Sequence, residues 1–86
     1  MIPKEWLQSQ MSAPEIAALG TPRGRVTRRM RPFLESLQTF KAQLKPSDEL
    51  WYFDSPSECW QSLGGCRGMA IVRDGDIVDT YVLMEN

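Results

Sequence analysis

The apolar positions in the N-terminal half of the chain follow the period of an α-helix. Between residues 26 and 44 they are spaced by four, three, four, three and four residues, which is typical of one helical face. These positions are Val26, Met30, Phe33, Leu37, Phe40 and Leu44. We predict a helix that Thr21 caps, with Pro22 in its first turn, and that ends before Pro46. Pro32 predicts a kink in its middle, because proline removes a backbone hydrogen bond there.

Two shorter helices are predicted before this stripe. Pro3 suits the first turn of a helix over residues 3–10. Ser12 and Glu15 have the spacing of a capping box, in which each residue satisfies a backbone N–H of the other. A second helix is therefore expected to start there, and Gly20 is expected to end it.

The period changes in the C-terminal half. Residues 49–53 are short and aromatic, which predicts a strand. Residues 55–63 open with serine and proline and predict a short helix. Met69–Arg73 and Ile77–Met84 predict two further strands, joined as a hairpin by the turn signal Asp74-Gly75.

These elements predict an α+β fold in which N-terminal helices, kinked near Pro32, pack on a small three-stranded sheet. A strand-helix-strand-strand unit forms that sheet. The chain has 86 residues, so residues 1–86 are expected to form a single domain. Residues 1–45 would be its helical, basic part and residues 46–86 its acidic strand-helix-hairpin part.

Charge is strongly polarised, although the net charge is only -1. Residues 21–45 sum to +6, and residues 46–86 sum to -6. Such asymmetry can mark an anionic partner for the basic half. It is equally explained if the basic helix lies beside the acidic half of the same molecule, and the charge pattern does not choose between the two.

Several features point to a protein of the cytoplasm. No apolar run is long enough to cross a membrane, and no signal peptide or lipidation motif is recognisable. Cys59 and Cys66 are the only two cysteines, fewer than a small secreted disulfide scaffold carries. Free thiols in a reducing compartment are therefore expected, although a bridge between the two would be compatible with their spacing.

The residue types offer little catalytic or metal-binding chemistry. The chain has no histidine, the commonest general base and metal ligand, and two cysteines alone make a poor zinc site. Cys59 has no histidine to activate it. The glycine-rich residues 63–68 lack the Gly-Lys-Ser/Thr ending of a phosphate loop, and Asp74, Asp76 and Asp79 lack the spacing of a calcium loop. We expect no catalytic residue, no metal and no cofactor.

Aromatic residues cluster at positions 51–53 and at Trp60. Such rings could form a stacking platform for single-stranded nucleic acid. Their neighbours are acidic and would repel phosphates. We therefore expect most of these rings in the core, with one face left for a protein partner.

Residues 12–31 carry the sharpest local motif. The stretch from Ile16-Ala17 through Gly20 to Met30 resembles the helix-turn-helix of bacterial regulators. The resemblance implies that Gly20 is the turn and that Val26 and Met30 are packed. It also implies that five arginines contact phosphates or base edges: Arg23, Arg25, Arg28, Arg29 and Arg31. The alternative is a helical hairpin whose arginines form a solvated face.

The C-terminal half also resembles a group of short uncharacterised bacterial proteins of unknown function. The residues that carry this resemblance are Asp48–Phe53, Ser55-Pro56, Trp60, Leu63-Gly64, Gly68, Ala70, Val72-Arg73 and Asp74-Gly75. The resemblance implies a recurring fold and brings no activity with it.

Two functions therefore stand as hypotheses. The first is a non-catalytic binding or accessory protein that binds another protein or a second copy of itself, since the apolar stripe also suits a dimer seam. The second is DNA binding through residues 12–31, which predicts a steep dependence of affinity on salt. An enzyme is disfavoured, because no nucleophile–base pair can be assembled from these residue types.

Overall fold

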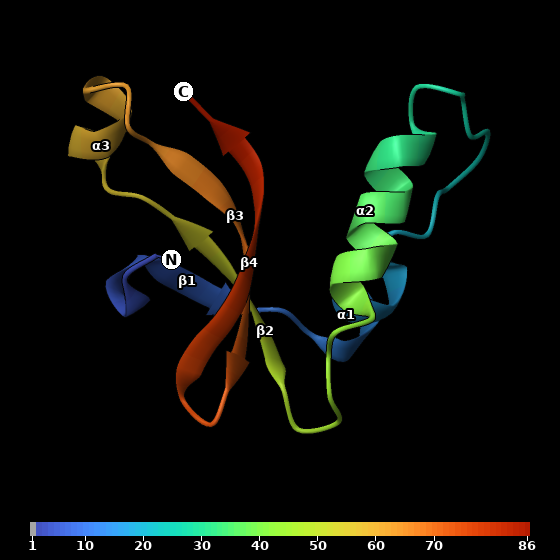
Figure 1. Ribbon diagram of the computed structural model, residues 1–86, viewed down its shortest axis with the longest axis horizontal. Helices are drawn as coiled ribbons and strands as arrows, with labels where there is room; N and C mark the ends of the chain where they lie inside the picture. The colour runs from blue at the N-terminus through green and yellow to red at the C-terminus, as the bar shows by residue number, and fades with distance from the viewer. Residues whose placement is uncertain (1) are drawn as a thin grey trace.

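The computed structural model describes residues 2–86 and shows an α+β fold, so the predicted class is confirmed (Figure 1). The elements are the short 3-10 helix η1 (Lys4–Trp6), β1 (Leu7–Gln10), α1 (Ala13–Ala18), α2 (Arg31–Lys41), β2 (Glu49–Asp54), α3 (Ser57–Gln61), β3 (Cys66–Arg73) and β4 (Asp76–Glu85). The four strands form one antiparallel sheet in the order β1-β2-β3-β4.

The prediction of a three-stranded sheet is wrong, because β1 adds a fourth strand. Residues 7–10 were expected in a helix, but Leu7 pairs with Phe53 and Gln10 with Trp51 of β2. The Met11 N–H continues this pairing by donating to the Leu50 carbonyl over 2.7 Å. Four residues are too few to show a strand period, so contacts with β2 decide their conformation.

The prediction of a long kinked helix is also wrong. The helix begins at Arg31, nine residues later than expected, and Pro32 lies in its first turn, where a missing N–H costs no hydrogen bond. Residues 21–30 form turns and coil. Gly24 has a φ of +97°, a left-handed conformation that a helix cannot contain. The proline therefore starts a helix and does not bend one.

Two local predictions are confirmed. Ser12 and Glu15 form the capping box: the Glu15 N–H donates to Ser12 Oγ, and the Ser12 N–H donates to Glu15 Oε1. Asp74 and Gly75 both have positive φ, +53° and +82°, as a tight turn between β3 and β4 requires. Both features depend only on neighbouring residues.

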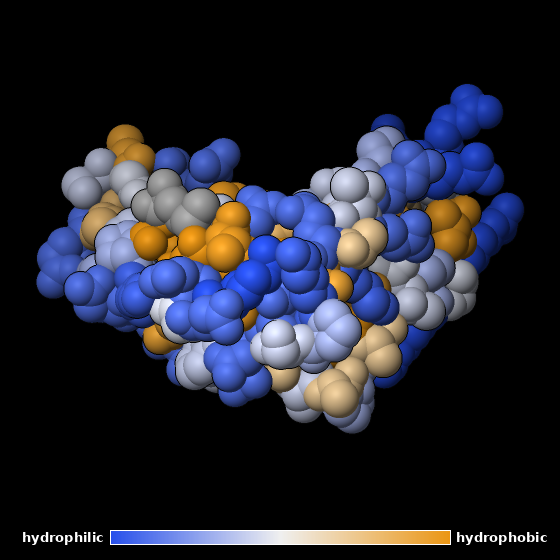
Figure 2. Space-filling view, turned by 60° about the horizontal axis from the view of Figure 1, so that its bottom comes forward, coloured by the Kyte–Doolittle hydropathy of each residue, from blue (hydrophilic) through white to orange (hydrophobic). Residues whose placement is uncertain are grey.

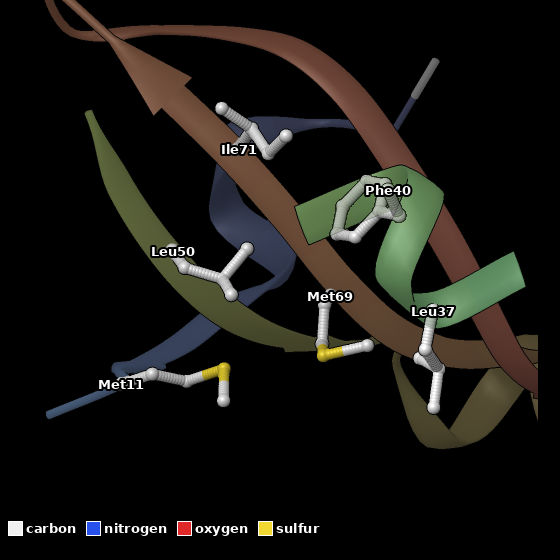
Figure 3. Packing of buried hydrophobic residues seen from close by; sticks show 6 residues of the cluster. All are labelled: Met11, Leu37, Phe40, Leu50, Met69 and Ile71. Atoms are coloured by element: carbon white, nitrogen blue, oxygen red, sulfur yellow. The ribbon is translucent and has the colours of Figure 1, made fainter. Parts of the chain in front are cut away.

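The main core lies between α2 and one face of the sheet (Figure 3). Its buried side chains come from β2, β3, α2 and the segment after β1: Met11, Leu37, Phe40, Leu50, Met69 and Ile71. Only the C-terminal half of the apolar stripe joins it. Phe33 is 49% exposed, and Val26 and Met30 are exposed as well. The N-terminal half of α2 leans away from the sheet (Figure 1).

The opposite face of the sheet also carries buried side chains. Phe53, Ala70 and Val72 are buried there, and Lys4 Nζ lies 3.1 Å from Asp76 Oδ1, which ties η1 to the β3–β4 turn. The register shifts beside Gly68. Any Cβ at Gly68 would overlap the Tyr81 carbonyl oxygen, so only glycine permits this close crossing of β3 and β4.

Candidate functional site

Strand β4 forms an open edge of the sheet. It pairs with β3 on one side, and within residues 2–86 no strand pairs with its other side. Edge strands present unpaired N–H and C=O groups that can recruit another strand. At about 3.3 Å per residue, the ten residues of β4 span ~33 Å, close to the full 37 Å length of the molecule.

One backbone group of this edge is occupied by its own strand. The Thr80 N–H donates to Asp79 Oδ1 over 2.8 Å. The carboxylate also places a negative charge on the edge strand. Asp79 therefore limits indiscriminate pairing, a common role of charged side chains on edge strands.

The edge also carries exposed apolar side chains. Val82 is 45% exposed and Met84 55% exposed, and Val78 and Leu83 are exposed to similar extents. Single exposed apolar residues are ordinary, but neighbouring ones indicate a binding surface. The C-terminal half of β4 therefore exposes more apolar side chains than its N-terminal half.

Figure 2 shows a hollow in one side of the molecule, and we call the part of it between β4 and the N-terminal half of α2 the notch. The rings of Phe33 on α2 and Tyr81 on β4 lie 6.5 Å apart in an edge-on arrangement and link the two elements. Ser36 Oγ donates to Tyr81 Oη over 2.8 Å and fixes the ring. Tyr81 therefore links β4 to α2 on the core face of the sheet, whereas the exposed Val82 lies on the opposite face, because Tyr81 pairs with Met69 and Val82 with Gly68.

The five sequence-predicted arginines lie together on residues 21–31, which we call the arginine segment. All five are exposed: Arg23, Arg25, Arg28, Arg29 and Arg31. Within residues 2–86 none of them forms an ion pair, since the pairs present are Lys4–Asp76, Arg67–Asp54 and Arg73–Asp48. The basic segment is therefore not neutralised by the acidic half of its own chain.

The geometry of residues 12–31 differs from that implied by the helix-turn-helix resemblance. Gly20 does turn the chain after α1, with a φ of +73°. Residues 21–30 are not helical, so the described chain has no second helix at this place. Val26 and Met30, expected to pack, are exposed. The arginines are carried by an irregular loop and by the first residue of α2.

Side chains of α2 hold the residues just before the arginine segment, whereas most backbone N–H groups of the segment have no backbone partner. Gln38 Nε2 donates to the Gly20 carbonyl over 2.9 Å, and Lys41 Nζ donates to the Ala17 carbonyl over 3.1 Å. Between residues 22 and 29, no N–H donates to a backbone carbonyl of the described chain. The segment therefore offers both charge and unused backbone donors.

The aromatic cluster does not form a stacking platform. Trp51 and Phe53 belong to one face of the sheet and Tyr52 to the other, where the Tyr52 hydroxyl donates to Glu15 Oε2 over 3.2 Å. Trp60 Nε1 donates to Asp54 Oδ1 over 2.8 Å. That bond is the main reason why the pKa of Asp54 is lowered.

The aromatic ring of Trp60 belongs to a structural cluster at the end of the sheet. The Arg67 guanidinium lies 5.6 Å from the Trp60 ring centroid and donates two hydrogen bonds to Asp54. Gly65 lies against the ring so closely that any Cβ there would overlap it. These contacts join α3 to β2 and β3, so we assign them to stability.

A second ion pair ties the other end of the sheet. Arg73 Nε and Nη2 donate to the two carboxylate oxygens of Asp48 over 2.8 and 2.7 Å, and the Lys45 N–H donates to Asp48 over 2.9 Å. The hydrogen bonds from Arg73 are the largest cause that lowers the pKa of Asp48 to about 2. The bidentate geometry links the turn before β2 to the end of β3.

The described residues hold few other candidate sites. Residues 2–86 contain no enclosed pocket and no cluster of three or more acidic or cysteine side chains placed to hold a metal ion. None of their helices has the length and apolar character needed to span a bilayer. Cys59 and Cys66 are free thiols, as predicted, and burial is the first cause that raises the pKa of Cys66.

Comparison with family models, curated proteins and solved structures finds no match to this chain. What the surface can bind therefore follows from its own geometry and charge. Sequence patterns had identified the arginines, but they did not identify the open edge of β4 as a site. The hairpin signal predicts a strand there, while its place at the edge depends on how all four strands are ordered.

Proposed function

We propose that this chain is a small, non-catalytic protein-binding module of a reducing cytoplasm, which takes an extended segment of another protein along the edge of β4. The observation that carries the proposal is the long open edge of β4 with its exposed apolar side chains. A bound segment would extend the sheet by one strand.

In such strand addition, both the backbone and the side chains of the bound segment would contribute to binding. Main-chain hydrogen bonds to β4 supply affinity, and alternate side chains of the bound segment supply specificity. The rings of Phe33 and Tyr81, which link α2 to β4, offer apolar contact beside the edge. Asp79 and Glu85 on β4 take part in no ion pair of the described chain, so they favour a basic segment.

Selection of displayed random peptides on the purified protein tests this function. We expect the enriched peptides to combine basic and apolar residues, and to lose at least about tenfold in affinity for Val82→Lys, which puts a charge on the edge. Leu63→Lys is the matched control, because Leu63 is 76% exposed and lies after α3, outside the edge strand β4. Peptides that bind both variants equally, or no enrichment at all, would contradict the proposal.

DNA binding is a second candidate, favoured by one observation: five exposed arginines without ion pairs in the described chain. Titration of labelled protein with a short random duplex tests it at ~50 mM and ~200 mM salt. Shifts confined to residues 20–31 that fade at the higher salt would support this candidate. An unchanged spectrum at both salts would exclude it.

A further inference from the structure

We propose that the segment bound by β4 comes from a second copy of this chain, namely its arginine segment, so that two copies exchange this contact. The inference rests on the proposed function and names its partner. It follows from three observations on the described residues: the distribution of charge, the unused backbone groups, and the poor fit of the simplest alternative dimer.

The charges of the two surfaces are complementary and neither is satisfied within one copy. The arginine segment carries five positive charges without an ion pair in the described chain, and β4 carries Asp79 and Glu85, which also lack one. Asp76 is already paired with Lys4. A second copy supplies the missing counter-charge to both surfaces at once.

Both surfaces also have backbone groups without a partner in the described chain. Residues 22–29 donate no N–H to a backbone carbonyl of the described chain, and the outer side of β4 has no partner strand there. The arginine segment also exposes Val26 and Met30, which suit the apolar side chains of β4. The arginine segment covers residues 21–31 and β4 has ten residues, so the two are similar in length.

Direct pairing of two β4 strands fits less well. In a symmetric antiparallel pair centred between Thr80 and Tyr81, Asp76 of one copy lies opposite Glu85 of the other, and like charges in that position are destabilising. Exchange of the arginine segment avoids this repulsion. When the same two copies exchange their segments reciprocally, as proposed here, the arrangement is a closed two-fold dimer and does not grow into a fibre.

Charge reversal tests this arrangement through the mass in solution. We expect the wild-type chain to sediment at twice its 9.8 kDa mass. Arg25→Glu with Arg28→Glu, and separately Asp79→Lys with Glu85→Lys, should each give monomers, because each variant sets like charges against each other. An equimolar mixture of the two variants should restore the dimer, since both exchanged contacts are then again between opposite charges.

A matched control separates the designed contact from general attraction between oppositely charged proteins. Glu5→Lys with Glu35→Lys changes the net charge by the same amount as the β4 variant, but at exposed residues of η1 and α2. This control keeps both contact surfaces and should dimerise with itself. Mixed with the Arg25→Glu, Arg28→Glu variant, it should leave that variant monomeric, because one of the two contacts of a mixed dimer still sets like charges together. Circular dichroism establishes that every variant is folded.

Three results would overturn the inference: a monomeric wild type at all concentrations, single variants that remain dimeric, or folded variants whose mixture stays monomeric. If the wild type is monomeric while displayed peptides still bind β4, self-association fails and the proposed function stands. If both fail, the proposed function fails too. Binding of a random duplex by the arginine segment of a monomeric wild type would assign the arginines to nucleic acid and would also overturn the inference.

Discussion

At the scale of single residues, the fold depends on a few positions whose roles are visible only in three dimensions. Ser12 with Glu15 and Asp74 with Gly75 were predictable, because a cap and a tight turn depend on adjacent residues. Gly68 was not predictable. Its need for glycine arises where β4 crosses β3, and residues 68 and 81 are distant in sequence.

Gly68→Ala is expected to lower the free energy of unfolding by about 1–3 kcal/mol, the usual cost of overpacking. The added Cβ would overlap the carbonyl oxygen of Tyr81, which belongs to the backbone and cannot rotate away. Gly64→Ala is the control, since its Cβ would meet only the Cys59 carbonyl at 3.8 Å. Urea unfolding measures both. Equal stability of the two variants would contradict the close crossing of β3 and β4.

The lowered pKa of Asp48 leads us to predict that the protein loses stability in acid. Its pKa is lowered from its ordinary 3.8 to about 2 in the folded chain, so it stabilises the fold fully above about pH 4. That contribution is lost as the pH falls through the folded pKa, because the unfolded chain binds the proton first. Urea midpoints of the wild type should therefore fall between pH 4 and pH 2.

Asp48→Asn removes the titrating group and should weaken the bond to Arg73. We expect this variant to be less stable than the wild type at pH 7, and to lose less stability between pH 4 and pH 2. Glu35→Gln is the control, because Glu35 is exposed and forms no ion pair in the described chain. An acid decline of the same size in the wild type and in the Asp48→Asn variant would show that other carboxylates cause it.

At the scale of elements, periodicity located the helix but not its beginning. The apolar stripe runs without interruption from Val26 to Leu44, yet the chain is helical only from Arg31. The sheet covers Leu37 and Phe40 but not the positions before them, and Gly24 interrupts the helix that the pattern predicts. A periodic pattern thus shows which face is apolar, while contacts decide how much of it is buried.

The two halves of the stripe should respond differently to truncation. Phe40→Ala should cost about 3–5 kcal/mol of unfolding free energy, as expected for a buried phenylalanine, because Phe40 is 3% exposed. Phe33→Ala should cost about 1 kcal/mol or less, in the range of surface substitutions. Urea unfolding compares them directly. Similar losses for the two would show that Phe33 is covered in solution.

At the scale of the whole molecule, the separation of charge along the chain becomes a separation in space. The α+β class and the hairpin could be predicted from sequence, whereas β1 could not, because a four-residue strand is specified by β2 and not by its own pattern. The arginines were identified as candidate contacts, but their lack of internal partners appears only in the fold. The two proposed contact surfaces therefore differ in origin. Sequence patterns identify the arginine segment, whereas the order of the strands creates the open edge of β4.

The central claim is that the edge of β4 receives an extended segment of protein. The most direct measurement is an amide NMR map of the labelled chain with the tightest displayed peptide. We predict that shifts and slowed hydrogen exchange follow residues 76–85 and the neighbouring Phe33, and that Val82→Lys abolishes them. Shifts confined to α3 or to the arginine segment, with β4 unchanged, would contradict the claim.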